Sequence, residues 1–516
     1  MATPMVLDIL GGTEVQKYKN LNSQRTVNWY LVMSTLSEAS KSQKSMFPTP
    51  GLTEFCDASA NGRYWRGAFI AQTLGSKDRC FAVLDTTLYE ILNNTTFINR
   101  GSLSQMATGW TRVKWAVNGN NQMYVGHETA GYNYDLVLNV LTQITDPVYP
   151  NVVSADYMDG SLIVADTKGE VRFNDVLNDF TNWTGLNGTG ALDVFIPSFK
   201  NDGAEAVFCL KEEIHVFGSS IITTYLNDGV SPFSRRYGST VKYGLAARDS
   251  AVVWNDGIIF LGRNEDGQYA VYTRGYDYSI NQISDFSKNW LLNDTLDTVK
   301  HAYAYITYTK DGHIWYHLTI PGLKTTLVYD IMTKEWFERQ SKQPYRDSDG
   351  MDVYREFRGK YHVNFLGHNL FFDQYSGKVF EEDYNNQTED GNTILRNRTS
   401  KIFEQSRLLI STSEFELDYN AGESATSSGQ GSDPIIMLEI SRDGGRTFGN
   451  PRNIRLGALG KFINRAKLNR LGIARAWCLR LTLTDPVDVM IQSCIASGTI
   501  NGPTNRENIK DMYGNR

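Results

Sequence analysis

The chain has 516 residues and is rich in glycine (44), tyrosine (28) and phenylalanine (24) but modest in proline (13), a composition typical of short strands joined by turns. Its net charge of −6 argues against a general nucleic-acid-binding protein, for which a clearly basic domain is expected. No apolar run approaches the roughly 18 residues of a membrane-spanning helix. We therefore expect a mainly β protein without a membrane span.

The cysteines favour a reducing compartment. Five are present, an odd number, and they are widely spaced and mostly set in apolar runs: Cys56, Cys80, Cys209, Cys478 and Cys494. Such thiols are typical of reduced core residues in a protein assembled in the cytoplasm. The first residues also lack the basic and apolar regions of a secretory signal.

Residues 1–45 are polar and mixed, and we interpret them as an N-terminal arm with a short helix around Tyr30 to Glu38. The arm leads into Phe47-Pro48-Thr49-Pro50-Gly51, where the prolines favour an extended backbone and the glycine a turn. We take this segment as the entry to the main domain, residues 46–383.

In the main domain, apolar strands recur on both sides of short turns. The turns are Asp159-Gly160, Asp256-Gly257, Asp311-Gly312 and Ser376-Gly377. Their density favours a β-propeller, whose blades take about 40–45 residues, so the domain would hold about eight blades, or fewer if the loops are long. A pair of stacked β-sandwiches is the alternative. One helical insert is predicted from Ser284 to Leu292, where apolar residues recur at helical spacing.

After Tyr384 a second, smaller domain is predicted over residues 384–500, followed by a polar tail over 501–516. Its signals are an apolar run over Ile435–Ile440, an Asp-Gly-Gly turn at residues 443–445, and strict alternation from Trp477 to Leu483. The fold class predicted is therefore all-β, with a β-propeller-like main domain and a smaller, β-sandwich-like C-terminal domain.

Catalytic signatures are missing from the sequence. It contains no phosphate-binding loop, nucleophile elbow, His-Glu-x-x-His or Cys-x-x-Cys, so we expect no enzyme, no catalytic residues, no cofactor and no metal site. His313 and His317 flank Trp315 and are interpreted as packing residues. The acidic loop over residues 347–352 fails the calcium-loop register, because Arg358 stands where a bidentate glutamate is required.

Ser441 to Phe448 resembles the Asp box of sialidase-type propellers, but only one good copy is present. We therefore favour a plain hairpin in which Asp443 accepts hydrogen bonds from the amides of its own turn.

A basic run follows this turn. Ten cations and one acid lie between residues 442 and 480, a local balance of +9 that leaves −15 for the rest of the chain. We rank docking to a protein partner first, a solvated strand face second and a DNA contact third. The candidate docking residues are Arg452, Arg455, Lys461, Arg465, Lys467 and Arg470.

Several short motifs, in order, resemble the head-completion or packaged-DNA stabilisation proteins of short-tailed bacteriophages, which form the tail hub or nozzle. The motifs are Pro50-Gly51-Leu52, Arg66-Gly67, Cys80-Phe81-Ala82-Val83, Leu88-Tyr89, Val216-Phe217-Gly218-Ser219-Ser220 with Tyr225, Lys242-Tyr243-Gly244-Leu245-Ala246, the Asp-Gly-Gly turn at 443–445, Arg470-Leu471-Gly472, and Leu481-Thr482-Leu483-Thr484-Asp485-Pro486-Val487. The loop from Asp383 to Arg398 is specific to this chain.

The resemblance implies a structural protein of the virion tail, assembled in the host cytoplasm. It implies a homo-oligomeric ring, a hexamer, beneath the portal and its adaptor protein. The ring would retain packaged DNA, dock tail fibres, spikes or a needle, and conduct double-stranded DNA during ejection without binding it specifically. From the charge we expect an acidic or neutral lumen, with the basic run facing a protein partner. The competing hypothesis is a propeller-type tail protein that binds or hydrolyses glycans.

Overall fold

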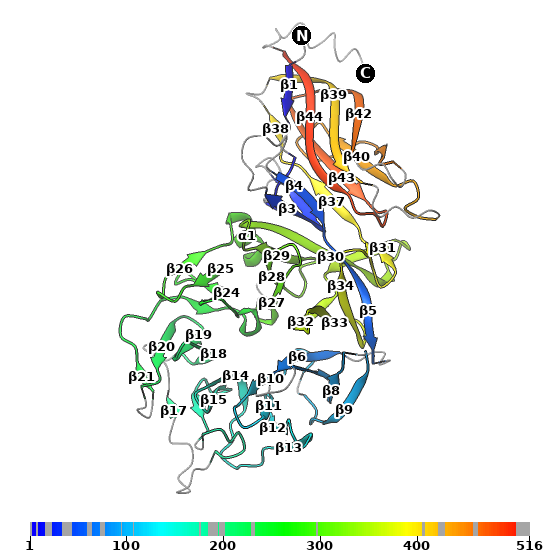
Figure 1. The fold of residues 1–516 in the computed structure, drawn as a ribbon. Coiled ribbons are helices and arrows are strands. Elements are labelled where there is room, and N and C mark those ends of the chain that lie inside the picture. The colour runs from blue at the N-terminus through cyan, green and yellow to red at the C-terminus, as the bar shows by residue number, and fades with distance from the viewer. Residues whose placement is uncertain are drawn as a thin grey trace.

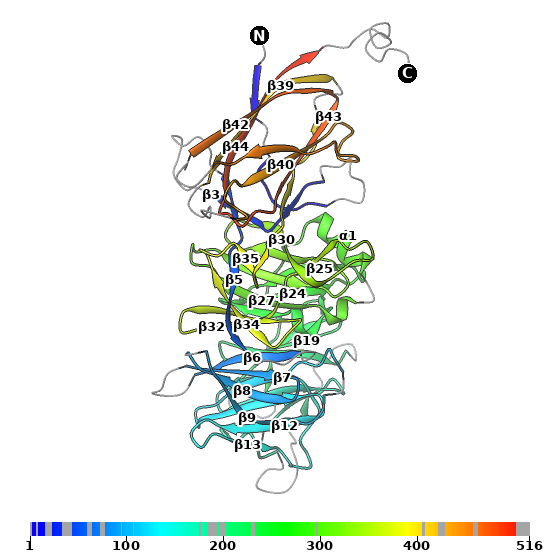
Figure 2. The same cartoon turned by 90° about the vertical axis from the view of Figure 1, so that its right-hand side faces the viewer.

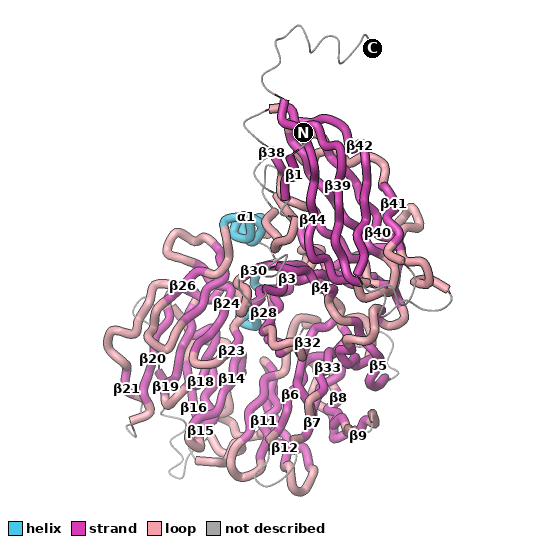
Figure 3. The backbone as a smooth tube through the Cα atoms, turned by 45° about the horizontal axis from the view of Figure 1, so that its top comes forward, coloured by secondary structure: helices cyan, strands magenta, loops and turns pink. Residues whose placement is uncertain are grey.

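The structure is a computed structural model that describes residues 3–6, 9–15, 23–33, 44–58, 64–72, 78–93, 95–106, 108–174, 177–183, 194–195, 202–228, 233–295, 298–404, 408–421, 429–457 and 463–501. These residues form a ring of small sheets below an elongated two-sheet layer (Figure 1). Figure 3 shows how strongly strands dominate, and the one α-helix described, α1 (Phe286–Asp294), lies where the ring approaches the upper layer.

The ring begins with four consecutive antiparallel sheets, each of four strands paired in chain order. Blade 1 consists of β6 (Trp65–Ala71), β7 (Arg79–Leu84), β8 (Thr87–Ile91) and β9 (Phe97–Ser102). Blade 2 consists of β10 (Lys114–Val117), β11 (Gln122–His127), β12 (Ala130–Asp135) and β13 (Val140–Gln143). Blade 3 consists of β14 (Val152–Met158), β15 (Ser161–Asp166), β16 (Val171–Phe173) and β17 (Val194–Phe195). Blade 4 consists of β18 (Ala204–Leu210), β19 (Glu213–Gly218), β20 (Ile222–Leu226) and β21 (Ser234–Arg235).

Three further blades complete the ring. Blade 5 holds β22 (Gly244–Leu245), the 3₁₀ turn η1 (Arg248–Ser250), β23 (Val252–Trp254), β24 (Gly257–Arg263), β25 (Tyr269–Arg274) and β26 (Ile280–Gln282). After α1 and η2 (Val299–His301), blade 6 holds β27 (Tyr303–Tyr308), β28 (Ile314–Thr319), β29 (Thr326–Asp330) and β30 (Glu335–Arg346), which also pairs with β31 (Asp352–Glu356). Blade 7 holds β32 (Gly359–Phe365), β33 (His368–Asp373), β34 (Lys378–Asp383) and the N-terminal strand β5 (Gly51–Asp57).

The ring closes between blades 7 and 1. Inner strands of neighbouring blades contact each other around the circle, and β32 packs on β6. Strand β5 descends from the upper layer and pairs with β34, so the outermost strand of the last blade comes from the start of the chain (Figure 1). The described residues therefore form a seven-bladed propeller. The estimate of about eight blades was too high because helix α1 and the long connections stretch the average spacing.

The Asp-Gly and Ser-Gly turns predicted from the sequence all join neighbouring strands of one blade. Between β14 and β15, for example, Asp159 (φ 49°) and Gly160 (φ 90°) both adopt the left-handed region that a two-residue hairpin turn requires. The predicted helical insert is also present as α1, and the side chain of Asp285 accepts a hydrogen bond from the amide of Lys288 as its N-cap.

The upper layer is a β-sandwich, which confirms the predicted fold class. One sheet contains β3 (Trp29–Met33), β4 (Lys44–Pro48), β44 (Met490–Asn501), β39 (Leu409–Asn420) and the edge strand β42 (Ile463–Ala474), with β1 (Thr3–Val6) on β44. The other contains β2 (Arg25–Val27), β37 (Arg396–Thr399), β43 (Ala476–Leu483), β40 (Ile435–Ser441) and β41 (Arg452–Arg455), with β38 (Phe403–Glu404) on β43. Alternating residues of the two sheets, such as Phe415, Leu438 and Leu481, form one buried core.

The segment predicted as a polar arm supplies strands to this sandwich. The expected helix from Tyr30 is wrong in its first part, because residues 29–33 form β3; residues 34–38 lie outside the described part of the chain. Trp29 and Leu31 face the sandwich core, whereas Tyr30 packs on Trp315 and Phe337 of the propeller. A strand that is buried on both faces does not alternate between polar and apolar residues. The sequence pattern therefore cannot distinguish it from a buried helix.

The sandwich and blade 6 share one continuous sheet. Strand β2 pairs in parallel with β30 (Val27 opposite Glu338) and antiparallel with β37 (Thr26 opposite Arg398), which gives an 11-stranded sheet running from β27 to β41. The hairpin of β35 (Thr388–Glu389) and β36 (Asn392–Thr393) adds to β5 in the sheet of blade 7. In Figure 2 the sandwich, blade 6 and the lower blades follow each other along one axis. The boundaries drawn at residues 45, 383 and 500 remain predictions.

Buried arginines fasten the N-terminal segment at this junction. Arg398, 1% exposed, donates hydrogen bonds to Ile9 O (2.5 Å), Gly12 O (2.9 Å) and Thr26 Oγ1 (2.8 Å). Fully buried Arg396 donates to Gln387 Oε1 at 2.5 Å and Thr49 O at 3.3 Å. Since unpaired buried charges are costly, these contacts hold Ile9, Gly12, Thr26 and Thr49 in place at the junction.

Candidate functional site

The predicted docking residues do not form one continuous surface. Arg452 and Arg455 lie on β41, in the sheet that continues into blade 6, whereas Arg465, Lys467 and Arg470 lie on β42, the edge strand of the opposite sheet. Lys461 lies outside the described residues. The sequence run is thus divided between two sheets.

An acidic ladder on β39 neutralises much of the charge on β42. Arg465 Nε lies 3.0 Å from Asp418 Oδ1, its directly opposite residue, and Lys467 Nζ lies 2.9 Å from Glu414 Oε1 and also contacts Glu416. Hydrogen bonds and the charge of these acids raise the pKa of both cations. The charge balance of residues 442–480 missed this ladder, because its acids lie on β39, outside that range.

Two arginines near the bulge of β42 keep an uncompensated charge. Arg452 donates to the carbonyl oxygens of Asn469 (3.2 Å) and Arg470 (3.3 Å), and Arg442 donates to Leu471 O (2.6 Å). Carbonyl oxygens satisfy hydrogen bonds but bring no negative charge, so these guanidinium groups remain cationic at the surface. Arg455, in contrast, lies 3.6 Å from Asp433.

The Asp443 turn has the plain structural role that we favoured. Its carboxylate accepts hydrogen bonds from the amides of Arg446 (3.0 Å) and Thr447 (3.0 Å) and from Ser441 Oγ (2.6 Å) and Thr447 Oγ1 (2.6 Å). The hydroxyl of Ser441 contributes most to lowering the pKa of Asp443, followed by that of Thr447. The second strand of this hairpin begins only at Arg452, so Thr447 and Phe448 belong to the turn.

The histidines and acidic loop also have structural roles. His313 Nδ1 is 2.5 Å from Asp330 Oδ2, and buried His317 stacks on Tyr305. Asp347 accepts from the amides of Asp349 and Met351 within its own turn. Across the described residues, no group of three or more His, Cys, Asp or Glu side chains is arranged to hold a metal ion, and the described helices include none long and apolar enough to cross a membrane.

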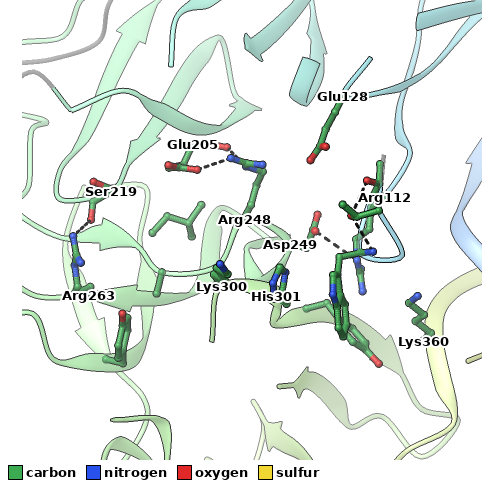
Figure 4. Close-up of a pocket in the computed structure, with 17 residues that line it drawn as sticks. Arg112, Glu128, Glu205, Ser219, Arg248, Asp249, Arg263, Lys300, His301 and Lys360 are labelled. Atoms are coloured by element: carbon green, nitrogen blue, oxygen red, sulfur yellow. Dashed lines mark hydrogen bonds and ion pairs between the residues drawn. The ribbon is translucent and has the colours of Figure 1, made fainter. Parts of the chain in front are cut away.

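A polar concavity that sequence reasoning missed lies on the propeller axis. This axial pocket has a volume of about 510 Å³ and receives residues from blades 2, 4, 5, 6 and 7 (Figure 4). Arg112 comes from the segment before β10, Arg248 and Asp249 from η1, Lys300 and His301 from η2, and Lys360 from the start of β32. Each of these residues lies at the start of the innermost strand of its blade or on the turn leading into it.

Contacts between blades that are not neighbours close the axis at this level. Lys114 Nζ of blade 2 lies 2.6 Å from Asp249 Oδ1 of blade 5. The guanidinium of Arg112 stacks between the rings of Tyr303 (4.3 Å) and Tyr361 (4.7 Å), from blades 6 and 7. In a ring of seven blades these partners face each other across the centre. Side chains therefore occupy the middle of the propeller.

The electrostatics of the axial pocket are dominated by cations. Burial alone would raise the pKa of Asp249, but Lys114 and Arg112 outweigh it and lower the pKa, so this carboxylate stays ionised. Burial, with the charges of Arg112 and Arg66 added, lowers the pKa of Lys360 to about 7. The pocket therefore disfavours further positive charge.

A sequence signal for this pocket existed but was scattered. Arg66, Arg112, Lys114 and Lys360 each stand within about three residues of the start of an inner strand. These residues come together because the inner strands of all blades begin at the same end of the propeller. That arrangement cannot be recognised without the number of blades and the closure of the ring through β5.

The fold defines a class: a β-propeller joined to a β-sandwich through one shared sheet. Comparison with protein families identifies it further. The model described as "Bacteriophage P22 Gp10, beta-propeller" matches residues 5–381, and that described as "Bacteriophage P22 Gp10, beta-sandwich" matches residues 396–499. The chain belongs to the bacteriophage P22 Gp10 family of tail hub, or nozzle, proteins. It is a structural component of the phage virion tail, as the sequence motifs predicted.

Other comparisons add little. The search of curated proteins finds no match. Among solved structures, the extracellular domain of the putative hybrid two component system BT4673 from B. thetaiotaomicron has a TM-score of 0.42 at 9% identity, over 70% of this chain and 43% of that chain. The computationally designed Ika8 protein has a TM-score of 0.35 at 12% identity, over 70% of this chain and 99% of that chain. These scores support no functional inference.

Proposed function

We propose that this tail hub protein assembles as a homo-oligomeric ring, a hexamer, beneath the portal and its adaptor protein. In that position the ring would retain packaged DNA, dock tail fibres, spikes or a needle, and conduct DNA during ejection. Membership of the family supports the hub. The stoichiometry, the partners and the absence of enzymatic activity are part of the proposal.

The observation that carries the proposal is the 11-stranded sheet shared by sandwich and propeller. A ring built from head-to-tail interfaces needs two different flanks at a fixed distance on every copy. Strand β2, held by Arg25 and Glu338 through paired hydrogen bonds of 2.7 and 3.0 Å, makes the two parts one body and fixes that distance. A ring under the pressure of packaged DNA needs this stiffness.

The DNA path follows from the closed propeller axis. The Lys114–Asp249 ion pair and the stacked Arg112 cross the centre, so a duplex has no route through an individual propeller. DNA would instead pass between the copies, along a lumen surrounded by chains of net charge −6. Such a lumen repels phosphates and releases DNA readily. Steeply salt-dependent binding of duplex DNA by the purified ring would contradict this.

For docking, we expect the partner to recognise Arg452 and Arg470 most strongly. Arg465 and Lys467 already satisfy the acids of β39, so their charge is largely cancelled. Among the described residues, Arg452 donates its hydrogen bonds to backbone oxygens, and no carboxylate lies within 4.0 Å of Arg452 or Arg470. Rim charges of this kind steer association with an acidic partner surface.

The experiment compares two variants that differ in where charge is changed. Arg452→Glu with Arg470→Glu should abolish association of the ring with its tail partner in sedimentation and in images of the ring mixed with its portal complex. The control is the swap Arg465→Asp with Asp418→Arg, which keeps the directly opposed pair and the net charge, and should dock normally. If the first variant docks like the parent protein, the basic run is a solvated face.

The glycan hypothesis gains no support from the axial pocket. Glu205 is engaged by Arg248 at 2.7 Å, and Asp249 is held ionised by two cations. A glycoside hydrolase requires a carboxyl group kept protonated as the general acid. Turnover of a surface polysaccharide by the isolated chain would reverse this conclusion.

A further inference from the structure

The axial pocket concentrates positive charge in a chain that is acidic overall. Its lining includes five cations, Arg112, Arg248, Arg263, Lys300 and Lys360, against three acids, Glu128, Glu205 and Asp249. Two of these acids already form ion pairs: Glu205 pairs with Arg248, and Asp249 pairs with both Arg112 (3.5 Å) and Lys114 (2.6 Å). The pocket therefore keeps a net positive charge.

Two lysines account for most of the uncompensated charge. Among the described residues, no carboxylate lies within 4.0 Å of the ammonium group of Lys300 or Lys360, and Figure 4 shows both side chains in the pocket wall without a dashed contact. Lys360 is half-buried beside Arg112 and Arg66, which are themselves cations. Like charges at close range repel, and an anion placed between them would convert the repulsion into attraction.

An aromatic platform borders the same pocket. The indole of Trp110 stacks on the imidazole of His301 with ring centroids 4.9 Å apart and planes 16° from parallel. Trp110 is 52% exposed, so its indole remains accessible beside Lys300. Flat rings of ligands stack readily on such a surface. The volume of about 510 Å³ is within the range of small-molecule sites.

We propose that the axial pocket binds a phosphate monoester that carries a flat ring, of the size and class of a nucleoside monophosphate. Lys360 and Arg112 contact the phosphate, Trp110 stacks on the ring, and Lys300, on the far side of His301 in Figure 4, adds positive charge at longer range. The same chemistry occurs in a free nucleotide and at a phosphorylated DNA end. The Lys114–Asp249 ion pair and the stacked Arg112 close the axis at this level, so a DNA duplex cannot enter through the propeller. The free nucleotide is therefore the expected ligand.

The test is calorimetric titration of the full chain at constant ionic strength with three probes: adenosine 5′-monophosphate, inorganic phosphate, and a 5′-phosphorylated blunt DNA duplex. We expect the nucleotide to bind about tenfold more tightly than inorganic phosphate, and the duplex not to bind. Tight binding of the duplex with weak binding of the nucleotide would overturn the free-nucleotide assignment.

Matched variants localise the binding. Lys360→Met should weaken nucleotide binding about tenfold, because it removes one charge-assisted contact, and Lys300→Met should weaken it less, because that charge acts at longer range. Trp110→Ala should abolish the preference for nucleotide over inorganic phosphate. Lys168→Met, at an exposed turn of blade 3, is the control and should bind like the parent protein. Trp110 is exposed, so Trp110→Ala keeps the fold and tests the site independently of Lys360→Met.

Two results would refute the proposal. One is the absence of heat from both small probes up to about 10 mM, which corresponds to negligible affinity. The other is unchanged nucleotide binding in the folded Lys360→Met variant. Neither bears on ring assembly, which is measured separately by sedimentation.

Discussion

Asn28 offers a direct test of how propeller and sandwich are joined. It stands between β2 and β3, where the chain leaves the sheet shared with blade 6 and enters the opposite sheet of the sandwich. Its side chain is fully buried, and its φ of 55° is left-handed. The amide donates to Gln340 O (2.9 Å) and Leu395 O (2.8 Å) and accepts from Gln340 N (3.0 Å), so it bridges the propeller and the sandwich.

The magnitude follows from these contacts. Asn28→Ala leaves three partly buried backbone groups unpaired, each costing about 1–2 kcal/mol. Alanine in the left-handed region adds about 1–2 kcal/mol. We therefore expect a loss of about 4–8 kcal/mol in the free energy of unfolding. Asn28→Gly removes the backbone strain but not the lost hydrogen bonds, and should lose about 3–6 kcal/mol.

Calorimetry measures the effect. The parent protein should unfold in one transition, because one sheet spans both parts, whereas both Asn28 variants should show separate transitions for sandwich and propeller. The control is Asn255→Ala, at an exposed hairpin position with a similar φ of 51°, which should lose only about 1–2 kcal/mol. The reasoning is refuted if Asn28→Ala unfolds in one transition and no more easily than Asn255→Ala.

Three further predictions concern charge and thiols. The pKa of Lys360 in the folded protein is about 7, below its usual value. Its positive charge therefore lowers the stability of the fold fully below pH 7 and progressively less up to about pH 10. We expect Lys360→Met to raise the melting temperature at pH 6 and to flatten the rise in stability between pH 7 and 10. The lowered pKa of Asp443 means that its carboxylate stabilises the fold above about pH 4 and that this stabilisation is lost on acidification. Asp443→Asn should therefore lower the urea concentration at half-unfolding more at pH 6 than at pH 2. Equal shifts at the two pH values would contradict this. Burial raises the pKa of Cys56 to about 12 and that of Cys209 well above its usual range. At pH 8, iodoacetamide should therefore label the native protein slowly, whereas in urea it should label all five cysteines. Rapid labelling of the native protein would contradict the burial of these thiols.

Local patterns predicted the blades better than their closure. The Asp-Gly turns and α1 depend on residues close in sequence, and the structure contains them where expected. The seven-blade count depends on β5 pairing with β34, a contact between the two ends of the propeller that no local pattern contains. The helix expected at Tyr30 was wrong because Trp29, Tyr30 and Leu31 are buried on two different faces.

The candidate sites show the same limit. The alternation of Glu414, Glu416 and Asp418 matches that of Arg465 and Lys467, so strand pairing could have indicated the acidic ladder. The axial pocket, in contrast, joins residues from five blades, and the sequence orders them along the chain rather than around a circle.

The closure of blade 7 also imposes an order on synthesis. Glu54 of β5 pairs with Phe380 of β34, so a strand that leaves the ribosome early must wait for nearly the whole propeller before it finds its partner. Until then blade 7 is incomplete and β5 exposes an unpaired edge. Strands β1 and β4 have the same delay, because their partner β44 is the last strand in the described part of the chain. A nascent chain therefore cannot complete the propeller and the sandwich until β44 has been synthesised.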